Sequence, residues 1–158
     1  MTPNSFVKTL TIIHFVLVAG LVILAGIFSY DDIGTAKFSF DTTDMFLLIF
    51  PVIVISTLTM SRIMFQKMVQ NAKNMEGLKK MLTQYQTASI VKFALIESPA
   101  MFGIVMYMVS KNATFIAISG VLILYLILQR PSKSKIENDL ELRGEARNQF
   151  RKYDSVID

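Results

Sequence analysis

The chain has 158 residues, of which 53% are hydrophobic, and a formal net charge of +4. A soluble domain of this size has too little interior to bury four apolar runs that each approach or exceed the roughly 20 residues needed to cross a bilayer. With no cysteine and a single histidine, the sequence excludes disulfides and cysteine nucleophiles, and we expect no metal and no cofactor.

Four apolar segments predict an all-α, four-helix transmembrane bundle. The expected spans cover residues 6–30, 45–65, 87–110 and 113–129. The first run is longer than the cleavable core of a signal peptide, about 7–15 residues, and no small-residue cleavage site follows, which predicts an uncleaved span. We therefore expect a membrane domain over residues 1–130 and a charged tail over residues 131–158.

The connection between the first two spans is polar and acidic. Phe38 and Phe40 are expected to anchor it at the interface, and the run Asp41–Asp44 supplies N-cap candidates for the second span. We interpret its aspartates as a solvated loop with helix caps, and a weak cation site is the alternative. These aspartates are Asp31, Asp32, Asp41 and Asp44.

Between the second and third spans, residues 66–86 are polar but carry apolar side chains at helical spacing. Steps of mostly three and four separate Met64, Met68, Met75, Leu78, Met81, Leu82 and Tyr85. The pattern predicts a helical hairpin that continues both spans, with a turn near Asn71–Asn74. A methionine-lined hairpin of this kind packs on itself or offers an adaptable surface to a partner.

The composition changes sharply after Arg130. Ser134 and Glu137 have the spacing of a capping box and predict a short charged helix to about Arg143, which Gly144 would end. The rest of the tail is charged and weakly hydrophobic, so we expect it to be helical only on contact with a surface.

Lysine and arginine are distributed unequally between the two sides of the predicted bundle. The connection at 30–44 has only Lys37 against four aspartates, and the turn at 111–112 adds only Lys111. Residues 62–86 hold five cations against Glu76, and residues 130–158 hold seven more. Because cytoplasmic loops carry the excess of cations, we expect both termini in the cytoplasm and a multi-pass protein of the inner membrane.

Glu97 is the residue most in need of explanation. It lies about ten residues into the third span, roughly 15 Å deep and near the midplane. An ionised carboxylate there costs at least roughly 2.5 kcal/mol, so it must be protonated, paired or hydrated. Ser98 and Pro99 follow it, and Pro99 leaves a carbonyl of the preceding turn without its donor. We consider three roles for the Glu97 carboxyl group. It forms a hydrogen bond to another helix, it is a proton or cation site, or it binds a ligand.

His14 is the expected partner of Glu97. It lies about eight residues into the first span, roughly 12 Å deep, and Thr11 is one turn below it on the same face. A hydrogen bond or ion pair between His14 and Glu97 would satisfy both groups. The alternative is that His14 simply packs against a neighbouring helix.

The remaining charges near the span ends are predicted to be interfacial anchors, because long cationic side chains reach the headgroups from the edge of the apolar core. They are Lys8, Arg62, Lys92 and Arg130.

The sequence favours a membrane subunit over an enzyme. The motifs G-x-x-x-x-G-K-S/T, H-E-x-x-H and G-x-S-x-G are missing, and the basic tail alternates with acids, which is a poor nucleic-acid footprint. We expect an accessory or scaffold subunit that contacts the bilayer and either other membrane subunits or a second copy. The alternative is a small proton- or cation-conducting protein with Glu97 as the titrating site.

Two resemblances bear on these expectations. Residues 94–105 (ALIESPAMFGIV) resemble the ion-binding helix of the proteolipid (c) subunits of rotary ATP synthases and V-ATPases, which implies an ion-binding carboxylate at Glu97. The chain departs from that family because it lacks a glycine-rich first helix, carries the glutamate on its third span, and has Pro99.

The second resemblance covers most of the chain. Four short segments follow, in the same order, the motifs of small four-span membrane proteins of Bacteroidota, which the chain resembles. They are Ile12-Ile-His14-Phe, Glu97-Ser-Pro-Ala-Met-Phe, Leu128-Gln-Arg-Pro-Ser-Lys and Ile136-Glu-Asn-Asp-Leu140. The similarity implies the four-span fold and brings no activity with it. It places His14 and Glu97 in shared motifs, which favours their pairing.

Overall fold

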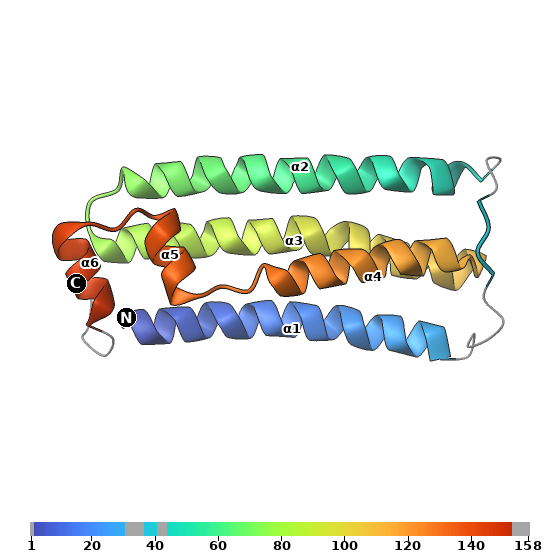
Figure 1. Ribbon diagram of the computed structural model, residues 1–158, viewed down its shortest axis with the longest axis horizontal. Coiled ribbons are helices and arrows are strands. Elements are labelled where there is room, and N and C mark those ends of the chain that lie inside the picture. The colour runs from blue at the N-terminus through green and yellow to red at the C-terminus, as the bar shows by residue number, and fades with distance from the viewer. Residues whose placement is uncertain (1, 31–36, 41–43, 153–158) are drawn as a thin grey trace. The chain divides into compact units, whose positions relative to one another are not determined.

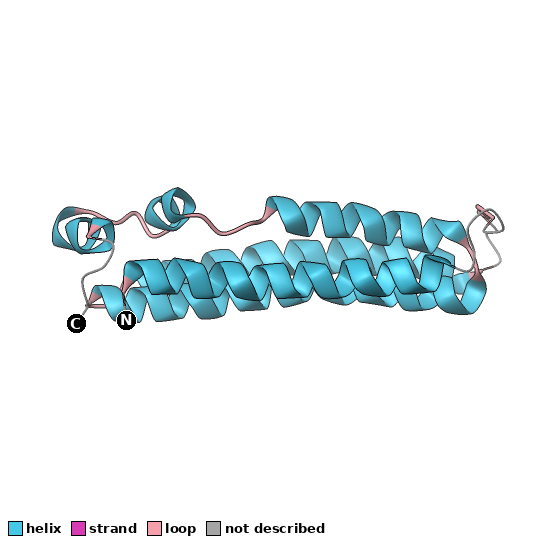
Figure 2. Ribbon diagram, turned by 90° about the horizontal axis from the view of Figure 1, so that it is seen from below, coloured by secondary structure: helices cyan, strands magenta, loops and turns pink. Residues whose placement is uncertain are grey.

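The computed structural model describes residues 2–30, 37–40 and 44–152 (Figure 1). Every regular element in these ranges is a helix (Figure 2), which confirms the all-α class. The helices are α1 (Pro3–Tyr30), α2 (Met45–Lys73), α3 (Leu78–Ser110), α4 (Ala113–Leu128), α5 (Lys133–Asp139) and α6 (Gly144–Arg151).

Three of these helices are long and apolar enough to cross a membrane. They are α1, α2 and α3, with 28, 29 and 33 residues. α4 has 16 residues and is about 24 Å long, short of a hydrocarbon core of about 30 Å. It makes a fourth span only when α4 and α5 are counted together as one broken span. The chain is therefore a multi-pass membrane protein with three or four spans.

The chain folds into two compact units. One, the charged unit, combines residues 1–15, 62–92 and 130–158, and the other, the apolar unit, combines residues 16–61 and 93–129. The charged tail thus shares a compact unit with the hairpin of α2 and α3.

An aromatic cluster from three helices forms the core of the apolar unit. Leu47 and Phe50 of α2, Tyr107 of α3 and Phe115 of α4 are buried together. The Phe50 ring centroid lies 5.5 Å from that of Phe115 and 5.7 Å from that of Phe102, in the range where aromatic rings attract. Large apolar side chains also cover the outside of the unit, as expected of a surface that faces lipid. They include Val22, Ile23, Ile27, Val52, Ile55, Val105, Val121 and Leu124.

Gly103 allows α2, α3 and α4 to approach closely within this unit. A Cβ atom at this position would collide with the Ser119 hydroxyl and the Phe50 ring, and would lie 3.1 Å from the Phe115 carbonyl oxygen. Ser119 is fully buried, and its hydroxyl donates to the Phe115 carbonyl at 2.9 Å. The glycine therefore serves the packing of three helices.

Asn112 joins the segment at residues 37–40 to the turn between α3 and α4. Its Oδ1 accepts from the backbone N–H of Thr114 at 3.0 Å, which caps α4, and from that of Ser39 at 3.3 Å. Its Nδ2 donates to the Ser39 carbonyl at 2.9 Å. The sequence predicted only a short turn here, although an asparagine directly before Ala113 is an N-cap signal.

The caps of the other helices differ in part from expectation. Asp44 caps α2, since its Oδ1 accepts from the backbone N–H of Phe46 at 3.0 Å. The other aspartates of the connection between the first two spans, Asp31, Asp32 and Asp41, lie outside the described residues. The hairpin turn falls at residues 74–77, later than predicted, because Gly77 adopts φ +91°, which favours glycine.

The predicted capping box at Ser134 is wrong. Ser132 has the extended N-cap conformation, and its hydroxyl accepts from the backbone N–H of Lys135 at 3.3 Å, so that Ser134 lies inside the helix. α5 ends at Asp139 and not near Arg143. Gly144, with φ +54°, begins α6 and does not end the preceding helix.

We expect Gly103→Ala to destabilise the protein, because the added methyl group has to displace a ring and a backbone segment. Overpacking of this kind costs about 1–3 kcal/mol. The measurement is thermal unfolding of the detergent-solubilised chain, followed by circular dichroism. Gly120→Ala is the matched control, because a Cβ there meets no atom within 4 Å, and alanine is favoured over glycine in a helix by about 1 kcal/mol. Equal melting temperatures for the two variants would contradict the close packing at Gly103.

Candidate functional site

Glu97 lies on the part of α3 that belongs to the apolar unit. One face of α3 is buried here, since Phe93, Ile96 and Ala100 each expose at most 2% of their surface. Glu97 is half-buried, and Ala94 and Ser98 beside it are exposed. Within the described part of its unit, no residue donates a hydrogen bond to the Glu97 carboxylate or pairs with it. The carboxyl group therefore sits in a membrane-spanning helix without a counter-charge from its own unit.

The two residues after Glu97 have separate environments. Ser98 donates its hydroxyl to the Ala94 carbonyl at 2.7 Å and is thereby satisfied within its own helix. Pro99 is buried, and α3 continues through it. Because proline has no N–H, the Leu95 carbonyl has no helical donor at this turn.

His14 and Thr11 lie on α1 in the charged unit. His14 is 5% exposed and continues the buried face formed by Phe6 and Leu10. The Thr11 hydroxyl donates to the Val7 carbonyl at 2.8 Å, a bond within the helix. Since His14 and Glu97 belong to different units, their pairing stays a prediction.

The predicted anchors differ in their burial. Lys8, Arg62 and Arg130 are exposed, whereas Lys92 is half-buried. The Lys92 ammonium lies 4.5 Å above the centroid of the Phe65 ring, a cation–π contact between α3 and α2. The Phe65 ring in turn meets the Tyr85 ring edge-on at 5.8 Å.

Acidic residues of the C-terminal tail join it to the hairpin, a feature that sequence reasoning missed. Tyr85 of α3 donates its hydroxyl to Asp139 at 2.8 Å, and the Lys73 ammonium lies 2.7 Å from the Glu141 carboxylate. Glu137 of α5 binds Arg147 and Arg151 of α6, the latter at 3.0 Å. The two arginines are four residues apart and lie on one helix face, which is a spacing that could have indicated a shared partner.

Apolar burial accompanies these polar contacts. Four side chains of the tail are at most 5% exposed, which is enough to hold short helices that would not be stable alone. They are Ile136, Leu140, Leu142 and Phe150.

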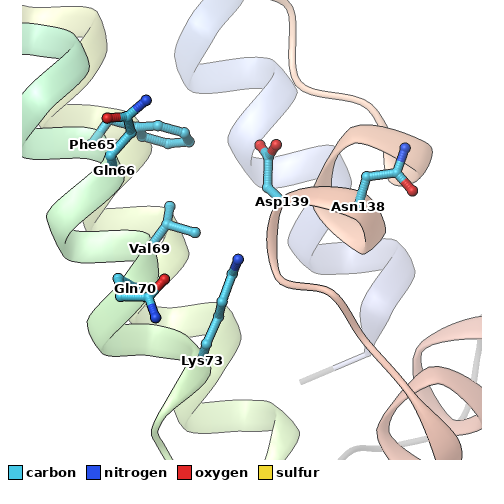
Figure 3. Close-up of a pocket in the computed structure, with 7 residues that line it drawn as sticks. All are labelled: Phe65, Gln66, Val69, Gln70, Lys73, Asn138 and Asp139. Carbon is cyan, nitrogen blue, oxygen red and sulfur yellow. The ribbon is translucent and has the colours of Figure 1, made fainter.

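A pocket of about 430 Å³ lies between α2 and α5 in the charged unit (Figure 3). Lys73 extends into this space from α2, and Asp139 borders it from α5 (Figure 3). Both charged groups already have partners, because Lys73 pairs with Glu141 and Asp139 accepts the hydroxyl of Tyr85. The described residues also contain no group of three or more acidic, histidine or cysteine side chains arranged to hold a metal. The remaining lining residues are Phe65, Gln66, Val69, Gln70 and Asn138.

The contact between α5 and α6 should weaken in acid. Hydrogen bonds from Arg151 and Arg147 hold the pKa of Glu137 below its usual value. A lowered pKa in the folded state means that the contact is fully present above the ordinary glutamate pKa, about 4.3, and is lost as the pH falls through the lower folded value. The protection factors of the α6 amides, which relate each exchange rate to the intrinsic rate at the same pH, measure this loss when neutral and acid pH are compared.

Glu137→Gln should lower the protection factors of the α6 amides at neutral pH and remove their further decrease in acid. Glu145→Gln is the matched control, because among the described residues the Glu145 carboxylate accepts a hydrogen bond from Gln149 of its own helix, at 3.4 Å, and does not join α6 to α5. If both variants behave like the wild type, the Glu137 contact does not hold α6.

Comparison with known family models, curated proteins and solved structures found no match for this chain. The similarities to proteolipid subunits and to four-span proteins of Bacteroidota therefore stay predictions.

Proposed function

We propose that this protein is an accessory or scaffold subunit of an inner-membrane complex, with four spans and both termini in the cytoplasm. The half-buried Glu97 carries the proposal, because a carboxyl group in a span with no partner from its own unit is suited to bond with a second protein. Polar side chains in lipid commonly join one helix to another. The exposed Ala94 and Ser98 beside it are small enough to let a partner helix approach.

The charged unit supports the proposed orientation. It contains the N-terminal segment together with the hairpin turn and the tail, and the hairpin and the tail are the segments with the excess of lysine and arginine. These cations match the positive-inside rule for cytoplasmic segments. The folded tail also gives the unit a defined surface, as a docking subunit requires.

The topology has a direct test. Single cysteines introduced at Ser39, Asn74 and Gln149 should differ in their reaction with a membrane-impermeant maleimide in intact cells, because the chain contains no native cysteine. Ser39→Cys should react, whereas Asn74→Cys and Gln149→Cys should react only after the membrane is permeabilised. Labelling of Gln149→Cys in intact cells would contradict the cytoplasmic C-terminus.

A second function, proton or cation conduction through Glu97, is favoured by the same unpaired position within its unit. An ionisable group inside a span marks an ion pathway when water reaches it. The exposed side of the Glu97 turn gives water or a second subunit access to the carboxyl group.

Glu97→Gln separates the two functions, since it keeps the size of the side chain and removes the titratable group. For a scaffold, we expect no ion flux in proteoliposomes from either form, and loss of a membrane protein that co-purifies with the wild type in mild detergent. For a conductor, the variant assembles normally and an existing flux collapses. Ser98→Ala is the control and should change neither measurement, because the Ser98 hydroxyl donates to a carbonyl of its own helix. Unchanged co-purification and flux in Glu97→Gln would contradict both functions.

A further inference from the structure

Glu97 belongs to a row of side chains that α3 leaves open along one side of the apolar unit. Ala94 and Met101 on either side of it are exposed, Met101 by 46%, and Met108 further along the helix is exposed by 40%. The steps between these four residues are three, four and seven, which is the spacing of a seam along which two helices pack. α3 therefore buries one face in its own unit and leaves a second packing face open.

The carboxyl group of Glu97 is the one ionisable group in this row. None of the residues that the structure describes in the apolar unit forms a hydrogen bond or an ion pair with it. Lipid offers neither a donor nor an acceptor, and a polar group that stays unpaired in the bilayer costs free energy. A protein that covers this face therefore gains most when it brings a hydrogen-bonding group to the level of Glu97.

A carboxyl group is complementary to a second carboxyl group. In its protonated form it has one O–H donor and a carbonyl acceptor, so two such groups that face each other form two hydrogen bonds. Two copies of one chain take the same orientation in the membrane, because the same cations determine the orientation of each. A two-fold axis along the membrane normal then brings equivalent residues to the same depth and opposite each other. A second copy thus supplies the matching group at the right level.

The neighbours of Glu97 suit a close approach of two copies. Ala94 is small, and small residues in membrane helices let two backbones come near enough for their side chains to interact. Met101 is unbranched and flexible, so it adapts to the surface that it meets. The two carboxyl groups then lie at the closest point of the contact.

We propose that two copies of this protein pair along this face of α3, with their Glu97 carboxyl groups hydrogen-bonded to each other across a two-fold axis. The inference rests on the proposed bond between Glu97 and a second protein, and it names that protein as a second copy of the chain. A single polar residue in an otherwise apolar seam also fixes the register of the two helices.

The first measurement is dimerisation in lipid. The purified full chain carries a donor or an acceptor dye at Gln149→Cys, since it has no native cysteine, and energy transfer is followed in phosphatidylcholine vesicles as lipid is added. Glu97→Leu should raise the dissociation constant about 5- to 30-fold, the factor that corresponds to a hydrogen bond between helices in a membrane. Thr59→Leu is the matched control and should stay within twofold of the wild type, because the exposed Thr59 donates its hydroxyl to a carbonyl of α2, at 2.8 Å. Circular dichroism verifies that each variant is folded.

The second measurement identifies the face. Met101→Cys should form a disulfide between two copies when membranes are treated with copper phenanthroline, because equivalent residues of the row lie opposite each other. Leu124→Cys is the matched control, since Leu124 is 62% exposed and belongs to α4, and it should stay monomeric.

Three outcomes would overturn the pairing. A wild-type chain that is monomeric at every dilution would exclude a second copy, and the scaffold role would stand if Glu97→Leu still loses another co-purifying membrane protein. An unchanged dissociation constant in Glu97→Leu would mean that Glu97 does not join the copies. Equal cross-linking of Met101→Cys and Leu124→Cys would mean random collision without a defined face. Conversely, dimers that depend on Glu97 while no other protein co-purifies would support the pairing and contradict a role in a larger complex.

Discussion

Helices inside a bilayer gain little by hiding apolar side chains from one another, because lipid is as apolar as the helices themselves. Close packing and satisfied polar groups have to hold them together. In the apolar unit this condition is met at Gly103, where the lack of a side chain lets Phe50, Phe115 and Ser119 come together. The outward leucines, isoleucines and valines can then remain exposed to lipid without weakening the fold.

The charged unit is held by different forces. Its contacts are cross-element pairs, such as Tyr85 with Asp139 and Lys73 with Glu141, together with buried apolar side chains of the tail. Water screens the charges of an exposed ion pair, so the burial of Leu140 and Phe150 contributes more to stability than any one of these pairs. The polar pairs give the tail its register on the hairpin.

The helices could be predicted from hydrophobic runs because each run is long and uniform, and α2 and α3 continue through the polar hairpin as their spacing indicated. The caps were harder. Ser132 and Ser134 both precede charged residues, and only the backbone conformation after Pro131 decides between them. The tail contacts were missed because Glu137 and Arg151 are 14 residues apart, a spacing without meaning until the chain turns back at Glu141 and Gly144. For Glu97 and His14, their positions in the spans could be counted, whereas a bond between two helices depends on the rotation of each helix, which hydrophobicity does not determine.

The length of α4 has a consequence for the surrounding membrane. In the four-span topology proposed above, the continuous part of the broken fourth span is α4, about 24 Å long, whereas the hydrocarbon layer is about 6 Å thicker. Acyl chains beside α4 then have to tilt or shorten, at a cost of a fraction of a kcal/mol per ångström. This local thinning of the bilayer costs less free energy when lipid with shorter chains, or a second protein with an equally short helix, replaces the ordinary lipid beside α4. Bilayer thickness would then influence where this protein accumulates and which neighbours it keeps.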